Sequence, residues 1–397
     1  MGNEVGREPE GGAQQQRRSL RDNFLRFGLP GGGGTVSTTA VEAGDGGGDG
    51  ERRRFRDIYM LQGRIGTGSH SQVFRAVERA TGREVAVKAV DTDTTGWLDR
   101  DLRHLAFLRA EISIHREVSG HPFVVDLLGA FEDPEACFIV EELAEGGSLL
   151  GYLHSRASMG TEGEVRLLLR RLLSALVFLH SRHIVHRDIK PENILILEEG
   201  VMHSGKLGDF GFATRLVQHT HAAPPAAAAT AVGTPEYVAP EVLLQQPFNG
   251  KADVWSAGVT AFCLLSGAMP FRGLTLDTLY TAVLDGACSY AGAEWGRVSP
   301  RAQDLVRRML VVDPRERWTA WQLLQHPWLV DEGTGTGGGF AGAGFAGARL
   351  ALGRRARVRL RAVFLVVVFL NRVRARARAR RRSRSRSLSL EQELGSP

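Results

Sequence analysis

His186-Arg187-Asp188-Ile189-Lys190-Pro191-Glu192-Asn193 and, after it, Asp209-Phe210-Gly211 are the two segments that decide the fold of this chain. Working outward, Ala239-Pro240-Glu241 follows them, and Ile65-Gly66-Thr67-Gly68-Ser69-His70-Ser71-Gln72-Val73 lies far upstream between two strand patterns. The glycines of the upstream segment allow backbone N–H groups to approach phosphate oxygens closely. A lone Gly-x-Gly more often marks a hairpin turn, so this segment is informative only together with the others.

A further segment, Val85-Ala86-Val87-Lys88, places a lysine on a buried strand. A buried ammonium needs a carboxylate partner, and Glu111 on the following helix is the natural candidate. Only four of the 50 basic residues are lysines. A lysine that is present against this bias indicates that its compact ammonium is needed.

Hydrophobic periodicity divides the central part of the chain in two. Residues 57–142 mostly alternate apolar and polar side chains, which predicts antiparallel strands, with one helix expected over 101–118. From 149 to 330 helical patterns dominate, notably over 165–180, 252–266 and 301–310. A strand-rich part followed by a helical part is an α+β arrangement.

The ordered set of these segments resembles the protein kinase family over about residues 57–330. The resemblance implies a bilobal kinase fold, with an antiparallel-sheet N-lobe (about 57–142) that carries one main helix and a mainly helical C-lobe (about 148–330). It also implies ATP and Mg²⁺ as cofactors and proteins as substrates.

The family's roles can be carried over position by position. Asp188 is expected to accept the substrate hydroxyl proton, and Lys190 to neutralise charge on the transferring phosphoryl group. Lys88 is expected to hold the α- and β-phosphates, with Glu111 fixing its ammonium. Asn193 and Asp209 are the expected Mg²⁺ ligands. The expected ATP-binding positions are Ile65, Gly66, Thr67, Gly68, Ser69, Val73, Ala86, Lys88, Glu142, Ala144 and Leu195.

The acceptor class can be read from two places. Lys190 after Asp188, together with Gly233-Thr234-Pro235-Glu236-Tyr237, resembles serine/threonine kinases. The sequence of residues 251–259 is similar to the corresponding segment of the calcium/calmodulin-dependent kinase group, including plant-type phosphoenolpyruvate carboxylase kinases and calcium-dependent kinases. Residues 91–96 imitate the start of a calcium loop, but Leu102 stands at the twelfth position, which excludes an EF-hand. The resemblance also pairs Arg317 with Glu241 in a structural role.

Two residues are placed in the activation loop by the resemblance, Thr230 and Thr234. In such kinases the arginine before the base, here Arg187, often pairs with a phosphorylated residue of that loop, and Thr230 occupies the usual acceptor position. The alternative is that Thr230 is a plain loop residue of a constitutively active kinase.

Two departures from the family pattern fall close together. Alignment places Glu141 at the gatekeeper position, where an apolar residue or threonine is usual, and His115 where the regulatory spine normally has a leucine. A buried carboxylate and a buried imidazolium are each costly alone, but they can share a charge-assisted hydrogen bond. We therefore expect His115 and Glu141 to pair; a one-residue slip in the alignment would instead turn Glu141 outward.

Composition excludes several classes of protein. The chain has 397 residues, 43% of them hydrophobic, and three well-separated cysteines, which argues against a disulfide scaffold or zinc module and favours a reducing compartment. No stretch approaches the roughly 20 apolar residues of a membrane span. A cytoplasmic location is expected, with the nucleus as an alternative.

The net charge of +6 conceals a strong asymmetry. Fifteen arginines lie between Arg349 and Arg386 without an acidic residue, and subtracting them leaves −9 for the rest of the chain. We expect a disordered glycine-rich segment (1–56), the kinase domain (57–330), a Gly/Ala linker (331–348) and an Arg-rich, disordered tail (349–397). The role of the tail has four alternative explanations: binding of a calmodulin-like partner, non-specific binding of nucleic acid, binding to an anionic membrane, or no role beyond compositional bias.

An active serine/threonine kinase is the function expected from all of this. A pseudokinase scaffold that binds partners through the same fold, and polyanion binding by the tail, are the alternatives.

Overall fold

The computed structural model describes residues 39–40, 54–67, 71–91, 98–133, 136–155, 160–216, 234–288, 290 and 295–330. The expected glycine-rich loop residues Gly68 and Ser69, the loop residue Thr230, the linker and the Arg-rich tail therefore lie outside the described residues. The chain forms two compact units, Met1–Arg116 with Asp126–Leu143, and Glu117–Val125 with Ala144–Pro397.

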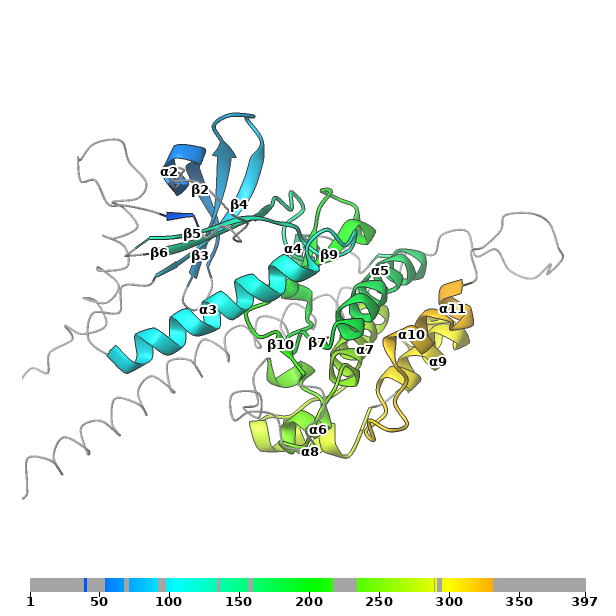
Figure 1. Cartoon of the computed structure of the whole chain (residues 1–397). Coiled ribbons are helices and arrows are strands. Elements are labelled where there is room, and N and C mark those ends of the chain that lie inside the picture. Colours follow the sequence, from blue (N-terminus) through cyan, green and yellow to red (C-terminus); the bar gives the residue numbers. More distant parts are fainter. Residues whose placement is uncertain are drawn as a thin grey trace, which may run out of the picture. The chain divides into compact units, whose positions relative to one another are not determined.

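The first unit is built on one antiparallel sheet with the strand order β1-β5-β6-β4-β3-β2 (Figure 1). Its strands are β1 Thr39–Ala40, β2 Tyr59–Thr67, β3 Ser71–Glu78, β4 Glu84–Asp91, β5 Leu127–Glu132 and β6 Ala136–Glu142. Its helices are α2 Phe55–Ile58 and α3 Leu98–Val118. The alternating pattern read from residues 57–142 thus forms the expected sheet and single main helix.

The two faces of this sheet have separate cores. On one face, Val85, Val87 and Ala89 of β4 join an aromatic group that includes Phe55 and Phe138, whose rings stack 4.2 Å apart. On the other, Val90 packs with Ile112 of α3 and with residues of β5 and β6. Alternate residues of β4 therefore face opposite sides, as the pleat requires.

Two boundaries differ from those expected from the sequence. The folded part begins before residue 57, because Phe55 of α2 is only 1% exposed and caps the aromatic core. Residues 117–125 belong to the second unit rather than to the N-lobe. The reason is backbone pairing within that unit: Val125 N–H donates to Leu207 O at 2.9 Å, and Leu207 N–H donates to Phe123 O at 2.9 Å.

The second unit is mainly helical (Figure 1). Its α-helices are α4 Leu149–Ser155, α5 Glu162–Ser181, α6 Pro240–Leu243, α7 Lys251–Ser266, α8 Leu276–Leu284, α9 Pro300–Met309, α10 Ala320–Leu324 and α11 Pro327–Val330. Its short strands are β7 Ile184–Val185, β8 Ile194–Ile196, β9 Gly205–Leu207 and β10 Thr214–Arg215, and its 3₁₀ turns are η1 Pro191–Asn193, η2 Met202–Ser204, η3 Pro235–Tyr237 and η4 Trp295–Arg297. The helices expected over 165–180, 252–266 and 301–310 are all present.

Local sequence explains where these helices begin. Thr161 and Glu164 form a reciprocal capping box that starts α5, and Ser299 caps α9 just before Pro300. Helix α7 has almost every residue buried, as expected of a helix that is apolar all round. It packs against α5 and α9, and Gly258 allows the close approach, since a Cβ there would lie 2.8 Å from Met309.

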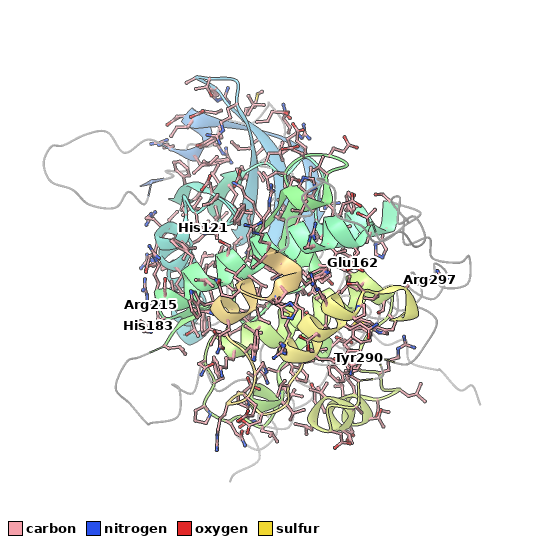
Figure 2. The ribbon with its side chains drawn as sticks, turned by 90° about the vertical axis from the view of Figure 1, so that its right-hand side faces the viewer. His121, Glu162, His183, Arg215, Tyr290 and Arg297 are labelled. Atoms are coloured by element: carbon pink, nitrogen blue, oxygen red, sulfur yellow. The ribbon has the colours of Figure 1, made fainter. Side chains whose placement is uncertain are left out.

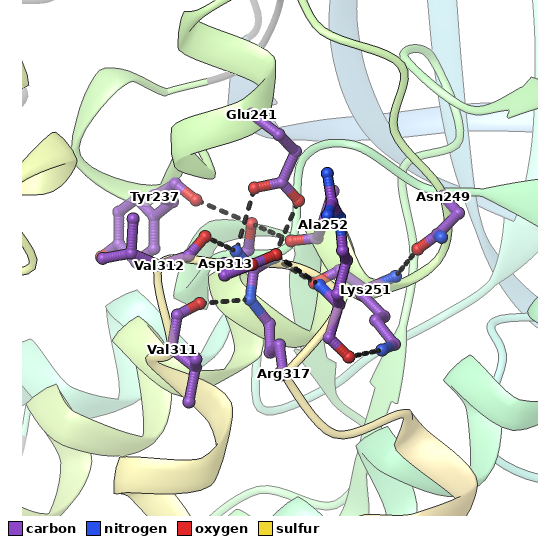
Figure 3. Close-up of polar contacts among 11 residues, drawn as sticks. Tyr237, Glu241, Asn249, Lys251, Ala252, Val311, Val312, Asp313 and Arg317 are labelled. Atoms are coloured by element: carbon purple, nitrogen blue, oxygen red, sulfur yellow. Dashed lines mark hydrogen bonds and ion pairs between the residues drawn. The ribbon is translucent and has the colours of Figure 1, made fainter.

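Two polar clasps join distant segments of this unit. Glu162, labelled in Figure 2, accepts hydrogen bonds from Ser299 Oγ at 2.5 Å and from Trp328 Nε1 at 2.7 Å. In the other clasp, Arg317 forms two hydrogen bonds with the Glu241 carboxylate, at 2.8 and 2.9 Å (Figure 3). The expected structural pairing of Arg317 with Glu241 is confirmed.

Candidate active site

The first unit carries the lysine that the sequence singled out. Lys88 lies on β4 and its Nζ is 2.7 Å from Glu111 Oε1 on α3. Both side chains are largely buried, with 17% and 11% of their surface exposed. In such surroundings a pair in contact is screened little by salt, so the carboxylate holds the ammonium in one place. The expected Lys88–Glu111 pair is therefore formed.

The described part of the glycine-rich segment forms the ends of β2 and β3. Thr67 pairs with Gln72 and Gly66 with Val73, after two register shifts that disturb β2 between Leu61 and Gly66. Irregularities of this kind bend a strand and aim its end differently from a regular ladder. Ile65 is half exposed, so an apolar side chain is presented to solvent at this end of the sheet.

The remaining expected nucleotide positions fall on both units. Ala86 is buried on β4, on the same strand as Lys88, and Glu142 is the last residue of β6. The Glu142 carboxylate accepts a hydrogen bond from Asp126 N–H at 2.8 Å, which fixes the end of that strand. Ala144 and Leu195 belong to the second unit, where Leu195 lies on β8.

The second unit brings the expected base together with three polar partners. Asp188 is 3% exposed, and its Oδ2 lies 2.7 Å from Lys190 Nζ and accepts a hydrogen bond from Asn193 Nδ2 at 2.8 Å. Its Oδ1 accepts from Thr234 N–H at 3.3 Å. Lys190 also donates to Thr234 Oγ1 at 2.8 Å. Asp188 is thus oriented by charge and hydrogen bonds on both oxygens.

The Asn193 side chain is held in place through its amide nitrogen. Its amide N–H groups donate to the Asp188 backbone O at 2.7 Å and to Asp188 Oδ2. Among the described residues none donates to its side-chain oxygen, which leaves a hard oxygen for a cation such as Mg²⁺. Asp209, the second expected ligand, is exposed and has a left-handed backbone, φ 58°. Among the residues described there is no group of three or more His, Cys, Asp or Glu that could hold a metal.

A buried aspartate supports the segment that carries the base. Asp253 of α7 is 0% exposed and accepts hydrogen bonds from the backbone N–H groups of His186 at 2.9 Å and Arg187 at 2.8 Å, and from His180 Nε2 at 2.9 Å. Burial alone would raise the pKa of Asp253, but the hydrogen bonds and charges of His180 and His186 together outweigh it, so the pKa is lowered. The carboxylate anchors the two residues that precede Asp188.

The sequence predicted no such role for Asp253, which lies within residues 251–259, the segment that carries the subgroup resemblance. The only available signal was a charged residue within an otherwise apolar helix, and nothing local indicates its partners 66 and 67 positions away in the chain.

Arg187 also has a left-handed backbone, φ 67°, and its Nε donates to Phe212 O at 2.6 Å. Burial lowers the pKa of its guanidinium, although Asp253 opposes this shift. Thr230, its expected phosphorylated partner, lies outside the described residues. The pairing of Arg187 with a modified loop therefore stays a prediction.

The two departures from the family pattern do meet. His115 Nδ1 lies 3.5 Å from Glu141 Oε1, with side-chain exposures of 1% and 13%. The contact expected between these two residues is present, and Glu141 is turned inward rather than outward.

Comparison with known proteins agrees with this geometry. The family described as "Protein kinase domain" matches residues 59–329. This chain belongs to the protein kinase family. It is 38% identical over 272 residues to human serine/threonine-protein kinase H1, covering 68% of this chain and 61% of that protein. It is 38% identical over 278 residues to rat serine/threonine-protein kinase DCLK1, covering 69% and 60%.

A plant relative bears on the subgroup. Calcium-dependent protein kinase 2 of Arabidopsis thaliana is 37% identical over 279 residues, 70% of this chain and 41% of that protein. Together with DCLK1 it supports the resemblance to the calcium/calmodulin-dependent kinase group. The matched region spans about three fifths or less of these relatives. Among the residues that the structure describes, no helix is both long and apolar enough to cross a membrane.

Proposed function

We propose that this kinase-family chain transfers the γ-phosphoryl group of ATP to serine and threonine hydroxyls of proteins. The observation that carries the proposal is the arrangement around Asp188, a buried carboxylate held by Lys190, Asn193 and Thr234. A carboxylate fixed in this way is suited to accept one proton, and the nearby ammonium is suited to neutralise transferring phosphate.

The proposed step balances as follows. The acceptor hydroxyl oxygen forms a bond to the γ-phosphorus while the bond from that phosphorus to the bridging oxygen breaks, so ADP leaves. The hydroxyl proton passes to Asp188. Lys190 stabilises charge on the phosphoryl oxygens, and Lys88, held by Glu111, binds the α- and β-phosphates.

Asn193 and Asp209 are the residues that would hold Mg²⁺. The side-chain oxygen of buried Asn193, to which no residue in the described part of the chain donates, fits a hard cation. Mg²⁺ supplies charge neutralisation for the phosphate oxygens when it is bound.

The test is phosphorylation of a serine, a threonine and a tyrosine peptide by the full chain with MgATP. Asp188→Asn keeps the shape of the side chain but removes the proton acceptor, and it should lower turnover by at least ~100-fold. The control is Asp285→Asn, an exposed carboxylate of the same unit, which should have no effect. Equal rates for the two variants would refute the assignment of Asp188. Nucleotide binding without transfer by the unaltered chain would instead support a pseudokinase scaffold.

For the Arg-rich tail we propose an anionic partner, either a calmodulin-like protein or a polyanion. Its 15 arginines without an acidic neighbour support this, since such a segment attracts anions. A cytoplasmic site of action, with the nucleus as the alternative, is supported by the three free cysteines of the chain, because persistent thiols suit a reducing compartment.

A further inference from the structure

A cavity of about 430 Å³ lies in the second unit, where the end of α5, the start of α7 and the start of α10 meet. Its walls include Val177 and His180 of α5, Lys251 of α7, and Ala320 and Trp321 of α10. Small-molecule sites in proteins have volumes of roughly 300–1,000 Å³ and mostly apolar walls with a few polar groups. This cavity, called here the α5–α7–α10 pocket, therefore has the size for one small ligand, and none of its lining residues belongs to the proposed catalytic or nucleotide site.

The walls of the pocket favour an aromatic anion. Trp321 is 62% exposed, although tryptophan is usually well buried, so its ring is accessible to a second aromatic ring. Lys251 Nζ donates to the backbone oxygen of Arg315 at 3.0 Å, and among the described residues no carboxylate pairs with it. An ammonium has three donors, so an anion can bind it as well. None of the described residues that line the pocket is acidic. A planar aromatic carboxylate complements both features.

Hydrogen bonds connect one wall of the pocket to the proposed base. The side chain of His180 is 18% exposed, and its Nε2 lies 2.9 Å from Asp253 Oδ2. The same oxygen accepts from His186 N–H at 2.9 Å, and Asp253 Oδ1 accepts from Arg187 N–H at 2.8 Å. These two residues directly precede Asp188. A group bound beside His180 is therefore linked through Asp253 to the backbone that carries the base.

The position of the His180 ring allows a ligand to act on this link. A Cβ at Gly250, another residue of the pocket wall, would lie 2.5 Å from Cγ and Nδ1 of the ring, so the backbone passes directly over it. Among the described residues no hydrogen bond reaches Nδ1, whereas Nε2 contacts Asp253. A ligand carboxylate that accepts from Nδ1 favours the imidazolium, and an imidazolium forms the stronger, charge-assisted bond with Asp253.

We propose that the α5–α7–α10 pocket is a regulatory site for a small aromatic carboxylate, which raises activity by strengthening the His180–Asp253 contact. Trp321 stacks on the ring of the ligand, while Lys251 and His180 bind its carboxylate. The regulatory part rests on the proposed function, because it acts on the segment that carries Asp188. The ligand binds more tightly when this segment is firmly held, and that difference in affinity shifts the equilibrium toward the firmly held state.

Binding is measured without activity by ¹⁹F NMR of the full chain labelled with 5-fluorotryptophan. The six tryptophans give at most six signals, and Trp321→Phe identifies the one from Trp321. The probe is 4-phenylbenzoate. It should shift the Trp321 signal saturably with a Kd below about 1 mM, the range expected for a ligand of about 15 heavy atoms.

Two comparisons test whether the pocket selects an anion. The amide 4-phenylbenzamide has the same shape without the charge, and it should bind about tenfold more weakly, the scale of one lost charge-assisted hydrogen bond. Lys251→Met should weaken binding of 4-phenylbenzoate by a similar factor. The matched control is Arg301→Met, which removes an exposed cation of α9 outside the pocket and should leave the Kd unchanged.

Regulation is measured as the ratio of kcat with and without saturating 4-phenylbenzoate. This ratio should be about five, the low end of typical coupling between sites. Amide hydrogen exchange at His186 and Arg187 should also slow on binding, since Asp253 accepts both N–H groups. His180→Asn has too short a side chain to join the ligand to Asp253, so it should keep most of the binding and lose both effects. His180→Gln replaces it if circular dichroism shows the asparagine variant to be unfolded.

The outcomes separate the site from its effect. The site is refuted if 4-phenylbenzoate does not shift the Trp321 signal or if the amide binds as tightly as the acid. A Trp321 signal that ignores the probe but moves as rising salt releases the Arg-rich tail would assign the pocket to the tail instead. Regulation is refuted if binding changes neither kcat nor hydrogen exchange, or if His180→Asn retains both effects. If the unaltered chain transfers no phosphate, the proposed function fails, and the Trp321 signal and hydrogen exchange alone decide this inference.

Discussion

The Arg317–Glu241 clasp gives the sharpest stability prediction (Figure 3). Both side chains are buried, with exposures of 0% and 2%. The guanidinium uses all five of its N–H donors. The Glu241 carboxylate accepts two of them, and the carbonyls of Val311, Lys251 and Val312 accept the others at 2.8, 2.8 and 3.2 Å. Glu241→Gln leaves a buried cation without its counter-charge and turns an amide N–H toward another donor.

The magnitude follows from this burial. Removing one partner of a buried ion pair costs about 3–5 kcal/mol, and no solvent is present to screen the loss. In a unit of roughly 150–250 residues, each kcal/mol moves the midpoint of unfolding by about 2–4 °C. Glu241→Gln should therefore lower the Tm by about 6–20 °C. Replacing both residues by methionine should recover only part of this loss, because three backbone carbonyls remain without donors.

Thermal unfolding followed by tryptophan fluorescence is a suitable assay, since five of the six tryptophans belong to the second unit. The matched control is Glu117→Gln, which breaks a more exposed pair with Arg215 in the same unit. Exposed pairs contribute about 0–1 kcal/mol, so this Tm should fall by less than about 4 °C. Equal Tm values for the two variants would refute the reasoning.

Three further predictions concern other parts of the chain. The pKa of Asp253 is lowered, so the stability that its carboxylate contributes is present above the ordinary aspartate pKa and is lost as the pH falls through the lower folded value. His180→Leu removes the main contact that lowers this pKa. Acid unfolding of that variant, monitored by circular dichroism, should therefore occur at a higher pH than for the unaltered protein. Gly250→Ala would place a Cβ 2.5 Å from the His180 ring, and it should lower the free energy of unfolding in urea by about 1–3 kcal/mol, but by less in a His180→Ala background. The 15 arginines of the tail should bind RNA in a filter-binding assay or anionic vesicles in a flotation assay. The affinity should fall steeply as the salt concentration rises, and binding should be lost on deleting residues 349–386. Binding that is insensitive to salt would contradict an electrostatic origin.

The sequence alone predicted the strand-rich and helical parts, the main helices and two residue pairs that the structure contains. Helical periodicity predicted α5 and α7 to within a few residues of their ends. The segments around Asp188 and Lys88 carried the family resemblance, and with it the pairs Lys88–Glu111 and Arg317–Glu241. These predictions succeed because side-chain period, capping residues and ordered motifs are local properties of a chain.

For the distant groups that the family resemblance does not pair, only the tertiary structure decided which of them satisfy one another. The sequence assigns Phe55 to the glycine-rich N-terminal segment, whereas the structure buries its side chain in the aromatic core of the sheet. Asp253 and Glu162 have no sequence signal for their partners, because a buried polar group takes whatever donors the fold brings to it. His115 and Glu141 could be paired in advance only because the family alignment supplied the fold, and the structure shows that both side chains are largely buried, with 1% and 13% of their surface exposed.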